Sequence, residues 1–169
     1  AQLTASTSTN QHTLTLSGAG AYNGTITVNS ASGTTGTLTA TGSGTISGVT
    51  LNGGTLDIDA DTTVTTLTVS ASSTIDLGGN TLTATVPTSS QEVTVNGGGT
   101  ISNVTLNGGT LDINANTTVS NALTTSANTT IDLGGNTLTA TVPTSSKVVT
   151  VSGGGTINAV TLSGGTLTV

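Results

Sequence analysis

Residues 44–58 read GTISGVTLNGGTLDI, and residues 99–113 repeat that phrase with a single substitution. A second phrase, TIDLGGNTLTATVPTSS, occurs without change at residues 74–90 and at residues 130–146. The copies of the first phrase are 55 residues apart and those of the second are 56 apart, which indicates one added residue near Asn121. Near-identical units of this length are typical of repeat proteins, in which each unit stacks on the next.

The repeats divide the chain into four segments of one domain. We predict an irregular N-terminal unit that acts as a cap or docking segment, two complete repeats and a partial third repeat. Within the single β domain 1–169, their bounds are 1–43, 44–98, 99–154 and 155–169. Terminal units of repeat arrays commonly depart from the internal pattern, which explains why the first segment matches the others only loosely.

Short runs with period 2, such as Thr13-Leu14-Thr15-Leu16, predict β-strands throughout and no helix. Asn-Gly-Gly and Gly-Gly-Asn clusters predict corners that need left-handed backbone angles. We therefore predict an all-β parallel β-solenoid (β-helix) with about three coils in each 55-residue repeat, because stacking places like residues above like. The alternative is an antiparallel β-sandwich, pilin-like and completed by strand donation. A sandwich core normally contains several aromatic side chains, and this chain has one Tyr and no Phe or Trp.

Composition argues against several classes of function. The chain has 44 Thr and 24 Gly among its 169 residues, a net charge of −6, one Lys and no Arg or Cys. We expect no nucleic-acid partner, because phosphate binding requires cationic side chains. We expect neither an enzyme nor a cofactor, because one His, no thiol and few carboxylates offer little for acid–base or nucleophilic catalysis. No run of about 18 apolar residues occurs, so we also expect no membrane insertion.

Three carboxylates form the only candidate metal site. Asp57, Asp59 and Asp61 alternate along one segment, and hard oxygen ligands of this kind suit Ca²⁺. The second repeat has Asn114 and Asn116 in place of the second and third of them. A solvated polar face is therefore the preferred interpretation, and we predict no metal while keeping the three residues as a calcium candidate.

Other polar residues receive structural predictions. Asp76 and Asp132 each precede a Gly-Gly corner, and we expect them to accept hydrogen bonds from its backbone N–H groups in an Asx-type turn. Tyr22 is expected to pack as a plug for the first coil. Stacked Thr-x-Thr ladders on a flat solenoid face can order water and bind ice, and the TLTAT run at residues 81–85 has that spacing. This run returns only after 56 residues, so we do not predict an unbroken array, and ice binding is one alternative function.

Two phrases carry a family resemblance. STIDLGGNTLT at residues 73–83 and GGTLDI at residues 53–58 resemble the repeat phrases of autotransporter passenger domains and related filamentous-haemagglutinin-like β-helices, over about residues 42–169. The resemblance implies an exported β-helix displayed outside a bacterial cell, often in adhesion. The opening Ala1-Gln2, without an initiator Met, fits an extracellular or cell-surface chain whose signal peptide has been removed.

The terminal coils suggest the function. Open coils expose backbone groups that can pair with another chain, and the phrase TLTV at residues 166–169 has no capping charge or proline. We predict a secreted, protease-resistant structural subunit that self-assembles head to tail into an extracellular filament or surface layer. Its partners would be copies of itself, with a host or neighbouring-cell surface as a further partner, and a fragment of a bacterial surface adhesin is an alternative. The predicted polymer contacts are Ala1, Gln2, Leu3, Leu14, Leu16, Leu167 and Val169.

Overall fold

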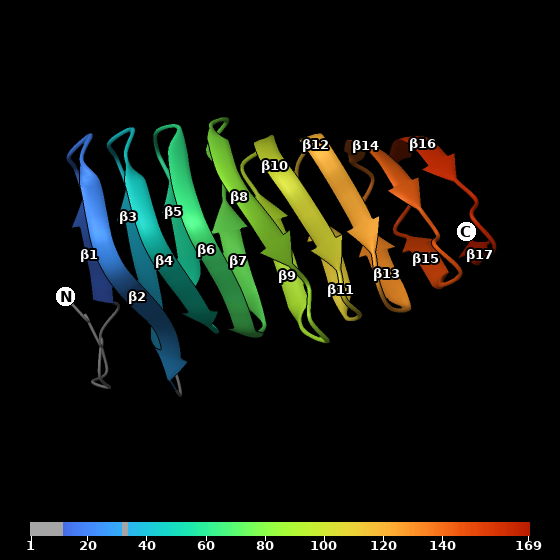
Figure 1. Cartoon of the computed structure of the whole chain (residues 1–169), viewed down its shortest axis with the longest axis horizontal. Helices are drawn as coiled ribbons and strands as arrows, with labels where there is room; N and C mark the ends of the chain where they lie inside the picture. Colours follow the sequence, from blue (N-terminus) through green and yellow to red (C-terminus); the bar gives the residue numbers. More distant parts are fainter. Residues whose placement is uncertain (1–11, 32–33) are drawn as a thin grey trace.

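The computed structural model describes residues 12–31 and 34–169. This part of the chain consists of strands and turns, and it has no helix of the length and apolarity that crossing a membrane requires. Figure 1 labels its 17 strands. They are β1 (His12–Leu16), β2 (Ala21–Ala31), β3 (Thr34–Ala40), β4 (Thr45–Asn52), β5 (Thr55–Ile58), β6 (Thr62–Ala71), β7 (Ser73–Asp76), β8 (Thr81–Pro87), β9 (Glu92–Asn96), β10 (Gly99–Leu106), β11 (Thr110–Ile113), β12 (Thr117–Thr125), β13 (Thr129–Asp132), β14 (Thr137–Pro143), β15 (Val148–Ser152), β16 (Thr156–Thr161) and β17 (Thr166–Thr168).

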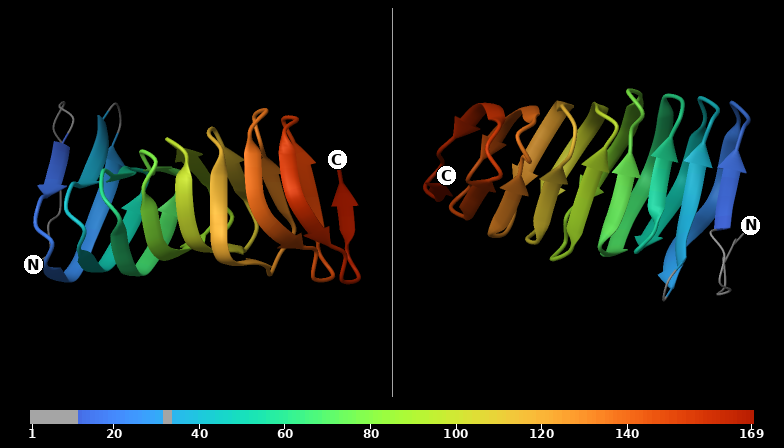
Figure 2. Two further views of the ribbon diagram at one scale, coloured as in Figure 1. Left: turned by 90° about the horizontal axis from the view of Figure 1, so that it is seen from above. Right: turned by 180° about the vertical axis from the view of Figure 1, so that it is seen from behind.

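The strands alternate between two parallel sheets. Each odd-numbered strand pairs with the next odd-numbered strand, forming the odd sheet, and the even-numbered strands form the even sheet in the same way. The chain winds from one sheet to the other, and successive turns stack along one long axis with β1 and β2 at one end and β16 and β17 at the other (Figures 1 and 2). The predicted β-solenoid is therefore confirmed.

The antiparallel sandwich is wrong. Antiparallel contacts among the described residues are confined to a two-residue pairing of β2 with β3 and one isolated bridge. Parallel pairing prevails because the corners return the chain to the same end of each sheet, so that every strand of a sheet runs in one direction.

Stacking places similar side chains above one another. In the odd sheet, Leu38 pairs with Leu56, and Leu56 pairs with Ile75. These three side chains are fully buried, at 0% exposure. The core is a continuous column of Leu, Ile and Val, and each coil buries its apolar side chains against the coils on either side of it.

The even strands bend in the middle. In β4, Ile46 and Val49 are both buried although they are three residues apart, because the register shifts between them in the pairing of β4 with β2. Similar shifts occur where β10 pairs with β8 and β12. A bulge of this kind turns the strand and lets one even strand cover a wider side of the core than an odd strand does.

The added residue of the second repeat lies in such a bulge. Ile101 pairs with Val119 and Asn103 pairs with Ala122, so two residues of β12 stand opposite one residue of β10. One of these two residues is Asn121, where the repeat comparison predicts the insertion. The extra residue is absorbed locally, and the stacking resumes on either side of it.

Glycine forms one type of corner. The backbone N–H of Asn80 donates to the carbonyl of Leu77 at 2.7 Å, and Gly78 and Gly79 between them have φ of 52° and 85°. Left-handed angles cost Gly almost nothing, because it lacks a Cβ. The Gly-Gly clusters are therefore corners, as predicted.

Serine forms a second type of corner that the sequence pattern did not predict. The backbone N–H of Gln91 donates to the carbonyl of Thr88 at 2.9 Å, and Ser89 and Ser90 between them have φ of 35° and 58°. Thr88 anchors this corner, since its buried hydroxyl accepts a hydrogen bond from the backbone N–H of Asn107 in the next coil. That cross-coil bond holds a turn that serine adopts less readily than glycine.

Candidate self-assembly interface

The coil formed by β16 and β17 has a sequence like that of a coil inside the stack, but its apolar side chains are less buried than those of such a coil. TINAVTL at residues 156–162 matches TISNVTL at residues 100–106 in five of seven positions and in order. Leu106 is 0% exposed, whereas its equivalent, Leu162, is 65% exposed. Leu111 is buried in β11, whereas its equivalent in β17, Leu167, is only partly buried. The same Ile, Val and Leu positions that are covered in the interior coil are thus less covered in this one.

Strand pairing explains the difference. β10 pairs with β8 on one edge and with β12 on the other. In the part of the chain that the structure describes, β16 pairs with β14 alone, and β17 pairs with β15 alone. The free edges of β16 and β17, together with the apolar side chains beside them, form what we call the C-terminal face.

The opposite end of the stack has a matching face. Over residues 12–31 and 34–169, β1 pairs with β3 by one edge, and β2 pairs with β4 in parallel. We call their other edges the N-terminal face. Leu14 and Tyr22 are partly buried beside it and pack against the core, which confirms the predicted packing of Tyr22 on the first coil. The hydroxyl of Tyr22 also accepts a hydrogen bond from the backbone N–H of Gly18 at 3.0 Å.

The described edge strands of the two faces contain none of the residues that normally protect an edge strand. β1, β2, β16 and β17 contain no Asp, Glu, Lys, Arg or Pro. Exposed edges in soluble proteins are usually blocked by charged side chains, by proline or by a covering loop. The composition of these four strands therefore places no charge or proline in the way of a further strand.

The structure places four of the seven predicted polymer contacts on these two faces. Leu16 is buried at 9% exposure at the end of β1, Leu14 is partly buried, and Val169 is 94% exposed beside β17. Leu167 is partly buried in β17. The other three, Ala1, Gln2 and Leu3, lie outside the described residues.

Sequence reasoning missed the contribution of β16. Ile157 and Val160 are partly buried on this strand, and Leu162 directly follows it with most of its surface exposed. The repeat offset was the available signal, because it aligns all three with residues of an interior coil. The prediction concentrated instead on the last phrase of the chain, which covers only the odd sheet.

The three aspartates of the calcium candidate have different surroundings. The carboxylate of Asp61 accepts a hydrogen bond from the backbone N–H of Thr81 at 2.8 Å. In the second repeat the side-chain oxygen of Asn116 accepts the equivalent bond from Thr137 at 2.9 Å, so the position needs an acceptor and not a charge. The described residues contain no group of three or more His, Cys, Asp or Glu placed to hold a metal ion.

Asp57 lies in an electrostatically unfavourable position. Burial raises the pKa of its carboxyl group above the ordinary value of 3.8, and the charges of Asp59 and Asp76 raise it further. A hydrogen bond from the Thr39 hydroxyl, at 3.2 Å, acts in the opposite direction. Asp57 and Asp76 are direct partners in the odd sheet, so two like charges stack on adjacent strands.

The predicted Asx-type turns are confirmed. The Asp76 carboxylate accepts a hydrogen bond from the backbone N–H of Gly78 at 3.2 Å. Asp132 does the same for Gly134 at 3.2 Å in the second repeat. These carboxylates stabilise corners of the solenoid.

Outward-facing Thr side chains form a line along the whole odd sheet, which we call the threonine rank. The sequence pattern did not predict it. Each odd strand contributes at least one outward-facing Thr, which lies next to an outward-facing Thr of a neighbouring odd strand. Between β9 and β11 the line of Thr side chains moves sideways by one outward-facing position, because Thr110 pairs with Glu92. Aspartates, including Asp57 and Asp76, occupy part of the adjacent column. The rank comprises Thr13, Thr37, Thr55, Thr74 and Thr94, then Thr110, Thr130, Thr150 and Thr168.

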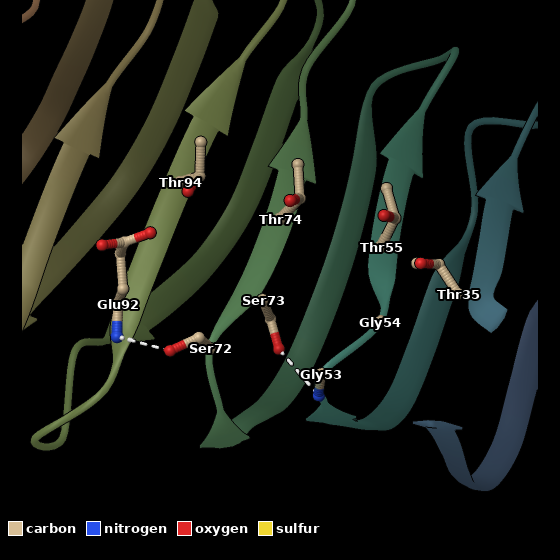
Figure 3. Close-up of a pocket in the computed structure, with 9 residues that line it drawn as sticks. All are labelled: Thr35, Gly53, Gly54, Thr55, Ser72, Ser73, Thr74, Glu92 and Thr94. Carbon is tan, nitrogen blue, oxygen red and sulfur yellow. Dashed lines mark hydrogen bonds between the residues drawn. The ribbon is translucent and has the colours of Figure 1, made fainter. Parts of the chain in front are cut away.

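Beside this rank is a shallow hollow of about 200 Å³, shown in Figure 3. Two of its hydroxyls are already engaged, since Ser72 accepts a hydrogen bond from the backbone N–H of Glu92 and Ser73 accepts one from that of Gly53. Its single carboxylate, that of Glu92, has no imidazole or second carboxylate in the lining. The lining residues are Thr35, Gly53, Gly54, Thr55, Ser72, Ser73, Thr74, Glu92 and Thr94.

Comparison with known proteins adds no assignment: no family model, no curated protein and no solved structure matches this chain.

Proposed function

We propose that this chain is a secreted structural subunit that assembles into an extracellular filament or surface layer by stacking its C-terminal face on the N-terminal face of a second copy. The contrast between Leu106 and Leu162 carries the proposal. The two residues share one sequence context, and only a further coil would give Leu162 the burial of Leu106.

Parallel stacking supports a head-to-tail arrangement. A second copy in the same orientation extends both sheets without changing the direction of any strand. Such a contact joins two different faces, so that each added subunit presents a new C-terminal face and growth does not close. The result is a fibre and not a dimer.

The energy of one joint can be estimated. Covering about five apolar side chains, at about 1.5 kcal/mol each, contributes roughly 7 kcal/mol. Association costs on the order of 4–15 kcal/mol in lost motion, so apolar burial alone is barely sufficient. The backbone hydrogen bonds of two strand pairs add to it. Assembly should therefore depend on concentration, with monomers at low concentration and polymers above a threshold.

A matched pair of charge substitutions tests the proposal. Leu162→Lys places a cation on the C-terminal face, and because Leu162 is 65% exposed the single subunit should fold as before. Ser120→Lys adds the same charge at an exposed position of β12 in the middle of the stack. Sedimentation velocity over a concentration series should show polymers for the wild type and for Ser120→Lys and none for Leu162→Lys. Equal behaviour of the two variants would exclude stacking through this face.

Ice binding is a second candidate, favoured by the threonine rank. Its hydroxyl and methyl groups recur at the strand spacing of about 4.8 Å along one face, which is a regular array for ordered water. The acidic column beside Thr55 and Thr74 interrupts a wider array. Thermal hysteresis of the dissolved protein tests this candidate, and freezing without hysteresis would remove it. Dispersed rods of one length, without polymers, would instead favour an adhesin fragment that binds through other parts.

A further inference from the structure

The even sheet is only partly paired at two places in the middle of the stack. Among the described residues, the pairing of β6 with β8 uses only Thr62 and Thr63 of β6, although both strands continue beyond it. The pairing of β12 with β14 uses only Thr117 and Thr118 of β12. The other neighbouring even strands are joined by five to seven residue pairs. We call the stretch between residues 64–71 and 84–87 the first opening, and the stretch between residues 119–125 and 140–143 the second opening.

The apolar core is less well covered at both openings. Leu67 is 8% exposed beside the first opening, whereas Val49, its partner in β4, is 1% exposed. Leu123 is 7% exposed beside the second opening, and Val104, its partner in β10, is 1% exposed. A shallow hollow of about 270 Å³ lies over the first opening. It is lined by Thr65, Thr66, Leu67, Thr85, Pro87, Thr105 and Asn107.

A proline at the edge of each opening explains why the pairing stops. The backbone N–H of Thr88 donates to the carbonyl of Thr105 in β10 at 3.1 Å. Successive residues of a strand inside a parallel sheet direct their backbone groups to opposite neighbours, so the nitrogen of Pro87 points toward β6. This nitrogen carries no hydrogen and cannot donate the bond that would continue the pairing. Pro143 has the same position in β14, because the residue that follows it donates to β16 at 3.0 Å.

The two prolines divide the even sheet into blocks. One position has Thr in every described even strand except β8 and β14, where it has Pro. This position is occupied by Thr27, Thr50 and Thr68, then by Pro87, Thr105 and Thr124, then by Pro143 and Thr161. The blocks are therefore β2, β4 and β6, then β8, β10 and β12, then β14 and β16. The prolines are 56 residues apart, which is the offset of the repeat, so the openings recur with the repeat.

The odd sheet stays paired beside both openings. All four residues of β7 pair with β9, and all four residues of β13 pair with β15. The odd sheet therefore connects the coils on either side of each opening.

We propose that the two openings are hinges, at which the even sheet separates further while the odd sheet stays closed. Separation there breaks only two residue pairs and uncovers side chains that solvent already reaches, so it costs less than separation within a block. The rod then bends with the odd sheet on the inner side of the curve. This inference concerns the single subunit and does not depend on self-assembly.

Hydrogen exchange of backbone amides, followed by NMR in the dilute monomer, tests the first hinge with a control in the same strand. Thr83 lies four residues before Pro87, so its N–H points toward β6, whereas the N–H of Leu82 points toward β10. Both residues lie in paired stretches, so a difference between them reports separation of the strands and not static exposure. After correction for intrinsic rates, the Thr83 amide should exchange at least about tenfold faster than the Leu82 amide. Equal protection of the two amides would overturn the proposal.

A reciprocal pair of substitutions tests the role of proline. Pro87→Thr introduces the residue of the other blocks and supplies an N–H directed toward β6. It should extend the pairing of β6 with β8 and slow the exchange of the Thr83 amide at least about tenfold. Pro143→Thr is the control, because it changes only the second opening and should leave the exchange of Thr83 as it is. An unchanged rate for Thr83 in Pro87→Thr, or equal slowing in both variants, would overturn the assignment of the hinges to the two prolines.

Discussion

The coil of β10 and β11 and the coil of β16 and β17 have nearly the same sequence and very different environments. Leu106 is fully buried and Leu162 is mostly exposed, although Val-Thr directly precedes both. In a solenoid the burial of a side chain depends on the coil that follows it, and the local sequence only determines which way it points. The comparison therefore identifies the C-terminal face as a surface whose side chains suit an interior position.

Truncating the two equivalent leucines to Ala should give the largest difference in the free energy of unfolding between the two coils. Leu106→Ala removes a fully buried side chain and should lower the free energy of unfolding by about 3 kcal/mol. Leu162→Ala should change that of the dilute monomer by about 0.5 kcal/mol or less, because little burial is lost. Denaturant unfolding followed by circular dichroism measures both. A large loss for Leu162→Ala in the monomer would show that this residue is covered within one subunit, and the contrast would fail.

A smaller difference in stability is expected from a position at which the two complete repeats have different residues. The Thr125 hydroxyl is buried and has no hydrogen-bond partner, whereas the first repeat has Val69 at the equivalent position. Thr125→Val should therefore raise the free energy of unfolding by about 1 kcal/mol, since an unsatisfied buried hydroxyl is costly. The reverse change, Val69→Thr, should lower it by a similar amount. No gain from Thr125→Val would indicate that the hydroxyl has a partner after all.

The smallest difference concerns the acidic column. The raised pKa of Asp57 means that the folded state holds this proton more tightly than the unfolded chain does. Stability from protonated Asp57 is thus present below the ordinary value of 3.8 and is lost as the pH rises through the raised value. Asp57→Asn should stabilise the protein at pH 7 by about 0.5 kcal/mol and have little effect at pH 3.

Unfolding at the two pH values measures this change. Asp112→Asn is the control, because its neighbour in the second repeat is Asn114 where the first repeat has Asp59. It should give a smaller gain at pH 7. An equal effect of Asp57→Asn at both pH values would show that the negative charge of Asp57 is not what destabilises the folded state.

Much of the fold could be predicted from the sequence, because the repeat offset, the period-2 runs and the Gly-Gly corners are all local signals. The Ser89-Ser90 corner could not, because its left-handed angles depend on the bond that Thr88 makes to the next coil. The threonine rank escaped prediction for a similar reason. It combines different phrases, such as Thr74 in one and Thr94 in the next, that become neighbours only once the register is known.

The interface shows the same division. The places of Leu14 and Leu167 in the two end coils could be predicted, because both lie in recognisable strand phrases near the ends of the repeat array. The exposure of Leu162 follows only from the topology, since it depends on β16 having β14 as its single partner among the described strands.

Cryo-electron microscopy of protein above its assembly threshold tests the central claim most directly. The account predicts filaments with an uninterrupted strand spacing of about 4.8 Å and a subunit repeat of about 43 Å, which is nine such spacings. Dispersed rods of one subunit length at every concentration, or filaments whose subunits join side by side, would contradict it.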